Sequence, residues 1–232
     1  YYNRGNAEAA RIDYVGAAAD FDMAIKLNPR YTEAYNARGN VRSAVKKYAD
    51  AIADFNQTLA LNPRFADAYN SRGQVNYTLE NYPQAIVDLD QAIALNPRFA
   101  EAYSTRGSAR YFLKNYPAAI ADASTALRLD PHDAMAYYTR GSSKFFLKDY
   151  DGVIADCSQV IGLDPKNPKA YHFRGLAEYR LKNYNDSLAD FDKAIELDSG
   201  LPVYYVDRSR VKLALRDFDG FIADCNQALQ LN

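Results

Sequence analysis

Few residues of this chain have the types and spacing that catalysis or metal binding needs. The two histidines, His132 and His172, fall on a predicted loop and a predicted helix far apart in the sequence, so they cannot chelate a metal together as a short motif. Cys157 and Cys225 stand where related segments hold Phe or Leu, which favours core residues over a reactive pair. No Ser-His-Asp or Cys-His arrangement and no Gly-rich phosphate loop stands out. We therefore expect no catalytic activity, no bound metal and no cofactor.

Charged residues recur instead at a fixed interval. An Arg-Gly pair repeats every 34 residues, from Arg4-Gly5 and Arg38-Gly39 to Arg174-Gly175, and a seventh copy has Arg208-Ser209. An Asp recurs with the same period, at Asp20, Asp54, Asp88, Asp122, Asp156, Asp190 and Asp224. Seven exposed arginines would suit a phosphate ligand, but the matching carboxylates favour a ladder of partly buried Arg–Asp ion pairs between helices.

Each period contains two segments that read as helices. Residues 67–81 are predicted to form a first helix, and residues 83–96 a second helix with apolar residues spaced for one helix face. Pro83 is tolerated in the first turn of the second helix, and Asn96-Pro97 ends it. No segment has a strand pattern. Each period is therefore predicted to be a helix, a tight turn and a second helix.

This period resembles the tetratricopeptide repeat. The resemblance rests on positions that recur in phase, which one copy fills with Tyr69, Gly73, Tyr82, Ala85, Leu89, Ala92 and Pro97. It covers the whole chain in seven copies, approximately residues 1–31, 32–65, 66–99, 100–133, 134–167, 168–201 and 202–232. It implies an all-α, right-handed superhelical solenoid of about fourteen helices that forms a single domain over residues 1–232. We call one repeat position, taken over all copies, a column. By analogy with the family, the Gly column lets the two helices of a copy approach closely, and the small residues Ala51, Ala85 and Ala119 are expected to face it.

Composition excludes several classes of protein. The chain has 232 residues, a net charge of −1 and 48% hydrophobic residues, which argues against disorder and against a nucleic-acid partner. No apolar run approaches the roughly 18 residues that span a bilayer, and no signal-peptide pattern is present, so membrane insertion is not expected. Because the sequence begins at Tyr1, we expect a fragment or a processed product. A cytoplasmic location is slightly favoured, although nothing in the sequence assigns a compartment.

The residues that vary between copies on the first helix are candidates for a binding groove. In this repeat family the first helix of each copy builds the concave wall of the solenoid, and helical spacing places these residues on one face. The early copies offer amides and the middle copies offer aromatic rings. The predicted groove residues are Asn36, Asn40, Asn70, Gln74, Tyr77, Ser104, Ser108, Tyr111, Phe112, Tyr138, Ser142, Phe145, Phe146, His172 and Tyr179.

This composition suits an extended protein or peptide ligand. Amides can donate to and accept from a peptide backbone, and exposed rings offer rigid apolar contact area. We expect the ligand backbone on Asn70 and Gln74, with space for it beside the rings at Ser108 and Ser142. The rings could instead pack onto neighbouring copies.

The predicted function is therefore a protein–protein interaction scaffold that catalyses nothing. One alternative is a substrate-selecting arm of a larger enzyme such as a glycosyltransferase, because the groove amides resemble the Asn-lined repeats of the enzyme that attaches N-acetylglucosamine to proteins. Another is a scaffold that self-associates through its terminal copies. The outer face of the last helix carries apolar residues such as Phe221, so we expect this end to be the least protected, or to be buried by a partner or by a further part of the chain.

Overall fold

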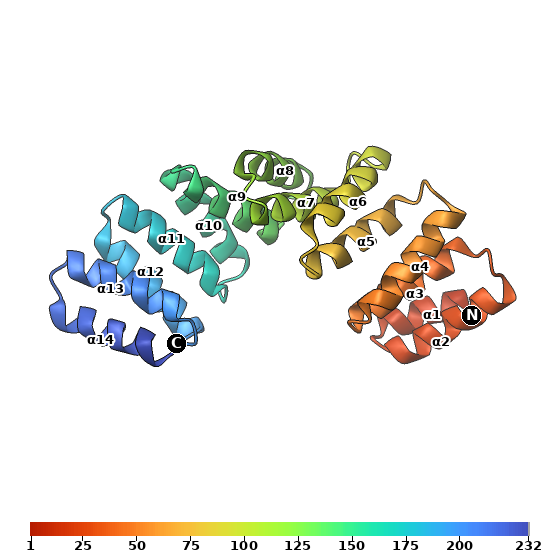
Figure 1. Cartoon of the computed structure of the whole chain (residues 1–232), viewed down its shortest axis with the longest axis horizontal. Coiled ribbons are helices and arrows are strands. Elements are labelled where there is room, and N and C mark those ends of the chain that lie inside the picture. The colour runs from red at the N-terminus through yellow and green to blue at the C-terminus, as the bar shows by residue number, and fades with distance from the viewer. Residues whose placement is uncertain (232) are drawn as a thin grey trace. The chain divides into compact units, whose positions relative to one another are not determined.

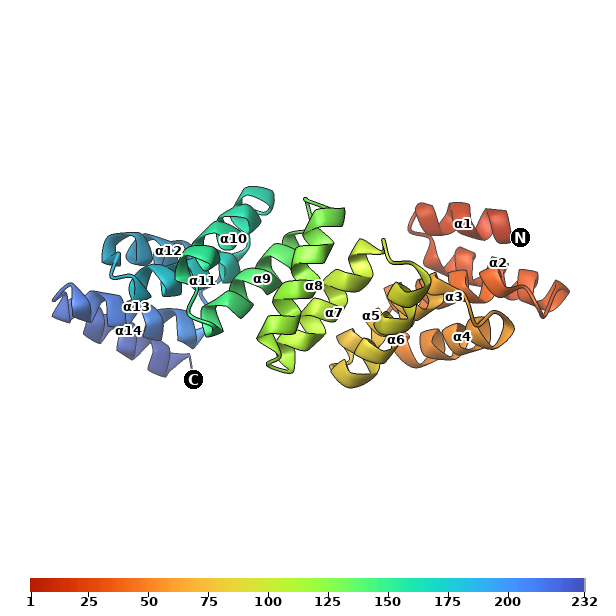
Figure 2. The same ribbon diagram turned by 90° about the horizontal axis from the view of Figure 1, so that it is seen from above.

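A computed structural model describes residues 1–231 and consists of helices joined by short turns (Figures 1 and 2). The described residues contain no strand, which confirms the all-α prediction of seven helix–turn–helix copies. The helices are α1 (Tyr2–Ala10), α2 (Tyr14–Leu27), α3 (Thr32–Ala44), α4 (Tyr48–Leu61), α5 (Ala66–Thr78), α6 (Tyr82–Leu95), α7 (Ala100–Phe112), α8 (Tyr116–Leu129), α9 (Ala134–Phe146), α10 (Tyr150–Leu163), α11 (Pro168–Arg180), α12 (Tyr184–Leu197), α13 (Pro202–Ala214) and α14 (Phe218–Gln230).

The chain divides into two compact units, Tyr1–Leu113 and Lys114–Asn232, and the boundary falls in the turn after α7. Within each unit, every helix packs against the next one along the chain. The first helices of successive copies also contact one another, as α5 does α7 and α9 does α11, whereas the described second helices of one unit do not. The first helices therefore form the inner wall of each unit. The single solenoid over residues 1–232 remains a prediction.

The turn inside each copy depends on one residue in the left-handed region. This residue has φ between 59° and 67° in all seven copies, and it is Ile12, Lys46, Glu80, Lys114, Lys148, Lys182 or Arg216. In the fifth copy Lys148 N–H donates to Phe145 O, and Asp149 N–H donates to Lys144 O, which is the Schellman arrangement that ends a helix. The turn therefore fixes where α9 ends and α10 begins. No glycine occupies this position, although glycine would adopt it without a Cβ penalty.

The turn between copies explains the recurring Asn-Pro and Asp-Pro pairs. Asn62 Oδ1 accepts a hydrogen bond from Arg64 N–H at 3.0 Å, and Asp164 Oδ1 accepts one from Lys166 N–H at 3.1 Å. Such side-chain turns mimic a backbone turn, and the proline between the two bonded residues cannot continue the helix. The second helix therefore ends at the same point in each of these copies.

The Gly column brings the two helices of a copy together, as predicted. A Cβ built at Gly73 would lie 2.8 Å from Leu89 Cγ, and one at Gly39 would lie 2.7 Å from Phe55 Cε1. The alanine that was predicted to face Gly73 does so through its backbone. Ala85 contributes its carbonyl oxygen, at 3.3 Å from the same Gly73 position, while the larger side chain one turn later fills the space. Phe55 and Leu89 are fully buried for this reason.

Candidate functional site

The Arg–Asp ladder is present inside both units. Arg38 Nη2 lies 2.6 Å from Asp54 Oδ1, and Arg38 Nε lies 3.1 Å from Asp54 Oδ2, so the contact has two points. The same contact joins Arg4–Asp20, Arg72–Asp88, Arg140–Asp156, Arg174–Asp190 and Arg208–Asp224. The ladder is thereby confirmed for these six pairs, while Arg106 and Asp122 belong to different units. The pairing removes the stripe of uncompensated arginines that a phosphate ligand would need.

Each pair is tied to its surroundings at further points. The hydrogen bond to Asp156 raises the pKa of Arg140 above its ordinary value, against the opposing effect of burial. Arg38 also bonds Asp22 of the preceding copy, and Arg208 bonds Asp192 in the same way at 2.7 Å. Every arginine of the column lies 5.4 to 5.6 Å from the ring centre of the tyrosine three residues before it. These contacts hold the two helices of each copy, and in part the neighbouring copies, in place.

The first unit carries a row of unpaired polar atoms on its first helices. Asn36 Oδ1, Asn70 Oδ1 and Ser104 Oγ occupy one column in three successive copies, and each atom is buried without a hydrogen-bond partner among residues 1–231. Asn70 is 3% exposed and Ser104 is 2% exposed. Asn70 Nδ2 donates to Glu101 Oε2 at 3.1 Å, which leaves the amide oxygen without a donor. An unsatisfied buried polar atom costs about 1–3 kcal/mol.

Acidic residues border this row. Glu33, Asp67 and Glu101 are exposed, and each lies one helical turn before a member of the row. The bond from Asn70 to Glu101 joins the two rows between neighbouring copies. Asn40 is exposed and Gln74 is half-buried on the following turn of the same helices. In the first unit the predicted amides therefore lie on the first helices, and one of them is bonded to a carboxylate of the next copy.

The predicted aromatic residues of the first unit pack on one another. Phe112 is 50% exposed and stacks on Tyr82 with ring centres 4.9 Å apart and planes within 4°. Tyr77 and Tyr111 also contact Phe112, at 6.1 and 5.3 Å. Burial raises the pKa of Tyr77, and its hydrogen bond with Ser108 opposes that shift. The rings thus join neighbouring copies and still leave part of Phe112 open.

The space that was expected beside the rings is not open. Ser108 is 3% exposed and Ser142 is fully buried, where its Oγ donates to the backbone oxygen of Thr139 at 3.2 Å. The small side chains let neighbouring groups close over them, and in the first unit Tyr77 is one of these groups. A ligand backbone therefore cannot lie on Ser108 or Ser142 without a rearrangement.

The second unit fills the same columns with larger groups that have partners. His172 Nε2 lies 2.8 Å from Asp207 Oδ2, and the His172 ring lies 4.8 Å from that of Tyr204. Phe145 contacts Tyr150 and Phe173, while Tyr179 packs on Tyr184. Phe146 repeats the stacking of the first unit, on Tyr116 at 4.5 Å, and Tyr138 meets Phe173 edge-on. Among the predicted residues of this unit, rings predominate, and each ring named here packs on another ring.

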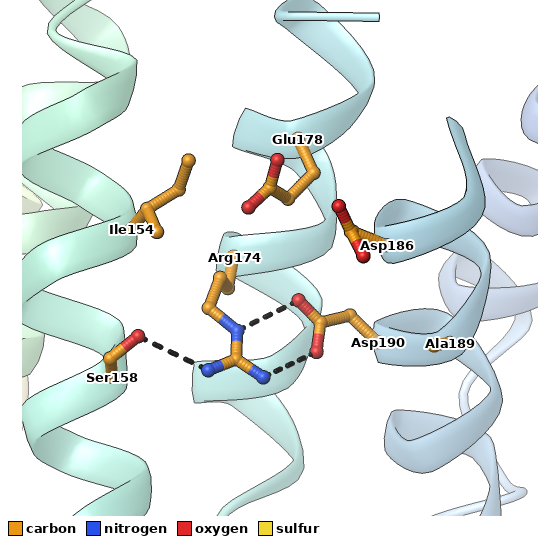
Figure 3. Close-up of a pocket in the computed structure, with 7 residues that line it drawn as sticks. All are labelled: Ile154, Ser158, Arg174, Glu178, Asp186, Ala189 and Asp190. Atoms are coloured by element: carbon orange, nitrogen blue, oxygen red, sulfur yellow. Dashed lines mark hydrogen bonds and ion pairs between the residues drawn. The ribbon is translucent and has the colours of Figure 1, made fainter. Parts of the chain in front are cut away.

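Sequence reasoning missed two groups of residues. Asp207 was not predicted, because its column holds no acidic residue in the other copies and its contact with His172 crosses from one copy to the next. A pocket in the second unit, lined by Ile154, Ser158, Arg174, Glu178, Asp186, Ala189 and Asp190, was also missed (Figure 3). The signal for the pocket was a Glu in a column that holds cations or Asn in most other copies.

Other kinds of site find little support in the described residues. No group of three or more His, Cys, Asp or Glu within residues 1–231 is placed to hold a metal ion. Burial raises the pKa of the Cys157 thiol to about 12, so this side chain is a core residue, as expected. None of the described helices combines the length and the apolar character that crossing a bilayer requires.

Comparisons with known proteins agree with the repeat architecture. Tetratricopeptide-repeat family models match residues 36–99, 77–134, 104–168 and 168–201. No curated protein matches the chain.

Solved structures share the fold. The peptide-binding tetratricopeptide-repeat protein YrrB is 23% identical, with a TM-score of 0.67 over 78% of this chain and 94% of its own. A tetratricopeptide-repeat protein from Parabacteroides merdae is 18% identical, with a TM-score of 0.70 over 100% and 91%. PilF from Pseudomonas aeruginosa is 18% identical, with a TM-score of 0.74 over 86% and 91%. The repeated helix pairs, the matched family models and these structures together lead to one conclusion: the chain belongs to the tetratricopeptide-repeat family.

Proposed function

We propose that this chain is a non-catalytic scaffold that binds an extended segment of a partner protein on the first-helix face of its repeats. The observation that carries the proposal is the row of unpaired atoms Asn36 Oδ1, Asn70 Oδ1 and Ser104 Oγ. Packing does not demand amides there, because the same column holds Tyr138 and His172 in the second unit. An extended segment offers backbone N–H groups at regular intervals, which is the chemistry that this row lacks.

The geometry makes such binding favourable. When a ligand N–H reaches Asn70 Oδ1, the amide need not rotate, because Asn70 Nδ2 keeps its bond to Glu101 Oε2. The unpaired acceptor then gains a donor, and the cost of about 1–3 kcal/mol that it imposes on the free protein is removed. The half-exposed ring of Phe112 offers apolar contact area in the same unit. Similarity to YrrB, whose structure is described as having an unusual peptide-binding site, agrees with this function.

The proposal is tested with the full chain and a library of acetylated ten-residue peptides. A peptide selected on the native protein is measured by fluorescence anisotropy against Asn36→Leu/Asn70→Leu and against Gln57→Leu, an exposed amide on a second helix. We expect the double variant to lose at least about tenfold in affinity, or about 1.4 kcal/mol, and Gln57→Leu to bind as the native chain does. Selection of no peptide, or equal binding by the double variant, would contradict the proposal.

Self-association is a second candidate function, favoured by one observation on the last copy. Leu229 is 73% exposed, whereas Leu59 and Leu127 in the same column are 8% exposed because a following copy covers them. Phe221 is half-buried, so Leu229 and Ile222, which is 54% exposed, are the more open apolar residues of α14. A mass that rises with concentration in light scattering, and falls in Ile222→Ser/Leu229→Ser, would support this candidate; a constant monomer mass would exclude it.

A further inference from the structure

A pocket of about 240 Å³ opens between α10, α11 and α12 in the second unit (Figure 3). Glu178 and Asp186 face each other across its mouth, and the Arg174–Asp190 pair lies below them, with Ser158 on the far side (Figure 3). Arg174 Nη1 donates to Ser158 Oγ at 3.1 Å, and its Nη2 lies 2.7 Å from Asp190 Oδ1. Three carboxylates and one guanidinium therefore surround this pocket. None of its lining residues belongs to the predicted groove.

The neighbouring copies show what normally occupies this place. In the fifth copy Lys144 lies over Gly152, and its Nζ is 2.9 Å from Asp156 Oδ2. In the seventh copy Lys212 follows the same path past Gly220, to 3.0 Å from Asp224 Oδ2. Arg42 and Asn76 supply the corresponding donor to the buried aspartates of the second and third copies, at 2.8 and 3.0 Å. The buried aspartate thus receives a second donor in each of these copies.

The sixth copy replaces this arrangement at two of its three positions. Glu178 stands where the fifth copy has Lys144, and Asp186 stands where it has Gly152. The two positions are neighbours in space, because a Cβ at Gly152 would lie 2.8 Å from Lys144 Cδ. Asn183 Nδ2 donates to Glu178 Oε2 at 2.7 Å, but it carries no charge. Asp190 is left with Arg174 as its cation, while two carboxylates stand above the pair.

We propose that this pocket binds the ammonium group of a lysine side chain carried by a partner protein. The ammonium would take the place that Lys144 Nζ has in the fifth copy, between the buried Asp190 and the more exposed Glu178 and Asp186. Two independent observations carry this assignment: an open cavity, and the same three repeat positions holding an ammonium group in the copies on either side. A lysine fits better than a metal ion, because the side chains are not placed as metal ligands within the described residues.

The site differs in chemistry and place from the first-helix face, so it does not rest on the function proposed above. A cation in the pocket offsets the repulsion among three carboxylates, which are partly shielded from water by the surrounding helices. An ammonium group carries three donors, and three carboxylates can accept them. The pocket should therefore prefer lysine over its acetylated form, which has lost the charge.

The experiment is an NMR titration of the full, isotope-labelled chain. The probe is the tripeptide acetyl-Gly-Lys-Gly-amide, and the comparison is the same peptide with an acetylated lysine side chain. We expect the lysine peptide to cause saturable shifts at the amides of Glu178, Asp186 and Asp190, and the acetylated peptide to cause none. Equal shifts with both peptides, or shifts that do not saturate, would overturn the proposal.

Two variants sharpen this test. Glu178→Lys/Asp186→Gly copies the fifth and seventh copies and places a lysine of the chain itself in the pocket, so we expect affinity for the probe to fall at least tenfold and thermal stability to rise. Asp151→Lys/Asp219→Asn makes the same change of net charge on exposed residues outside the pocket and should bind as the native chain does. Unchanged binding by Glu178→Lys/Asp186→Gly would assign the shifts to the general surface charge. Asn36→Leu/Asn70→Leu should not alter the NMR shifts that the lysine peptide causes. The proposal for this pocket and the proposal for the groove can therefore be refuted independently.

Discussion

The first-helix faces of the two units differ in how completely their side chains are satisfied. In the first unit the column of Asn36, Asn70 and Ser104 leaves three buried polar atoms without partners. In the second unit His172 fills that column, and it is hydrogen-bonded to Asp207 and packed on Tyr204. Both units have the same Arg–Asp pairs beneath these faces. The difference in this column therefore does not come from what the fold requires; outside the column, the buried Tyr204 hydroxyl of the second unit also lacks a partner.

The largest expected effect tests what the two units share. Arg140→Leu in the second unit leaves Asp156 with Lys144 as its cation in a buried setting, and Arg72→Leu leaves Asp88 with Asn76 alone. We expect each to lower the free energy of unfolding, by about 3–5 kcal/mol where the remaining partner carries no charge and by less beside Lys144. Urea unfolding followed by circular dichroism measures this.

The matched double variant checks the cause of that loss. Adding Asp156→Ala to Arg140→Leu, or Asp88→Ala to Arg72→Leu, should recover part of the stability, because the uncompensated charge is gone. If the free-energy losses of the single variants simply add in the double variants of both units, the paired residues do not interact. The Arg–Asp pairs would then not be a stabilising feature that the two units share.

A second prediction tests the difference between the two faces directly. His172→Leu removes a partner of the buried Asp207 and should lower the free energy of unfolding by about 1–3 kcal/mol. Asn70→Leu removes an unpaired oxygen and should leave stability unchanged or raise it slightly. Thermal unfolding of the two variants provides the measurement. A loss of stability in Asn70→Leu as large as that in His172→Leu would mean that Asn70, like His172, already has its hydrogen-bond partners within the chain.

A smaller effect is expected in the turns, where strain is distributed unevenly between the units. Ile12 has φ of 65° and is 72% exposed, so a β-branched residue holds a left-handed conformation without buried contacts in return. Ile12→Gly should raise the free energy of unfolding by about 1 kcal/mol, since relief of strain exceeds the added flexibility of the unfolded chain. Lys148→Gly, its counterpart in the second unit, should gain less, because lysine is not β-branched. A loss of stability in Ile12→Gly would contradict the assignment of strain.

The smallest expected effect concerns a helix cap. Asp149 caps the start of α10, where its side chain accepts a hydrogen bond from Gly152 N–H, whereas Lys47 in the cap position of α4 makes no such bond. Lys47→Asp should therefore stabilise α4 by about 0.5 kcal/mol. Hydrogen exchange of the first turn of α4 should slow in the variant, and Lys47→Ala, which cannot cap, serves as the control.

Sequence reasoning predicted most of the fold because the signal is repeated. The Arg, Gly and Asp columns recur at one spacing, so each copy supports the interpretation of the others, and the helix ends follow from the Asn-Pro pairs and the prolines at helix starts. The site was less accessible, because it depends on contacts between copies. Spacing along one helix could not reveal that Ser108 lies beneath Tyr77, or that His172 finds its partner in the next copy. The only sign of the acidic pocket in the sequence was Glu178, which differs from the cations or Asn in most copies of its column. Its significance became clear only from the structure, which shows that Lys144 of the preceding copy reaches a buried aspartate.

The two kinds of contact made by the arginine column bear on how the chain unfolds. Inside a copy the arginine binds an aspartate that is nearly inaccessible to water, whereas between copies Arg38 and Arg208 bind Asp22 and Asp192, which are 56% and 54% exposed. Exposed pairs contribute about 0–1 kcal/mol and weaken in salt, but the buried ones cannot be opened halfway without stranding a charge. Each helix pair should therefore behave as one cooperative step, and fraying should proceed by whole copies, with added salt loosening the junctions before the copies themselves.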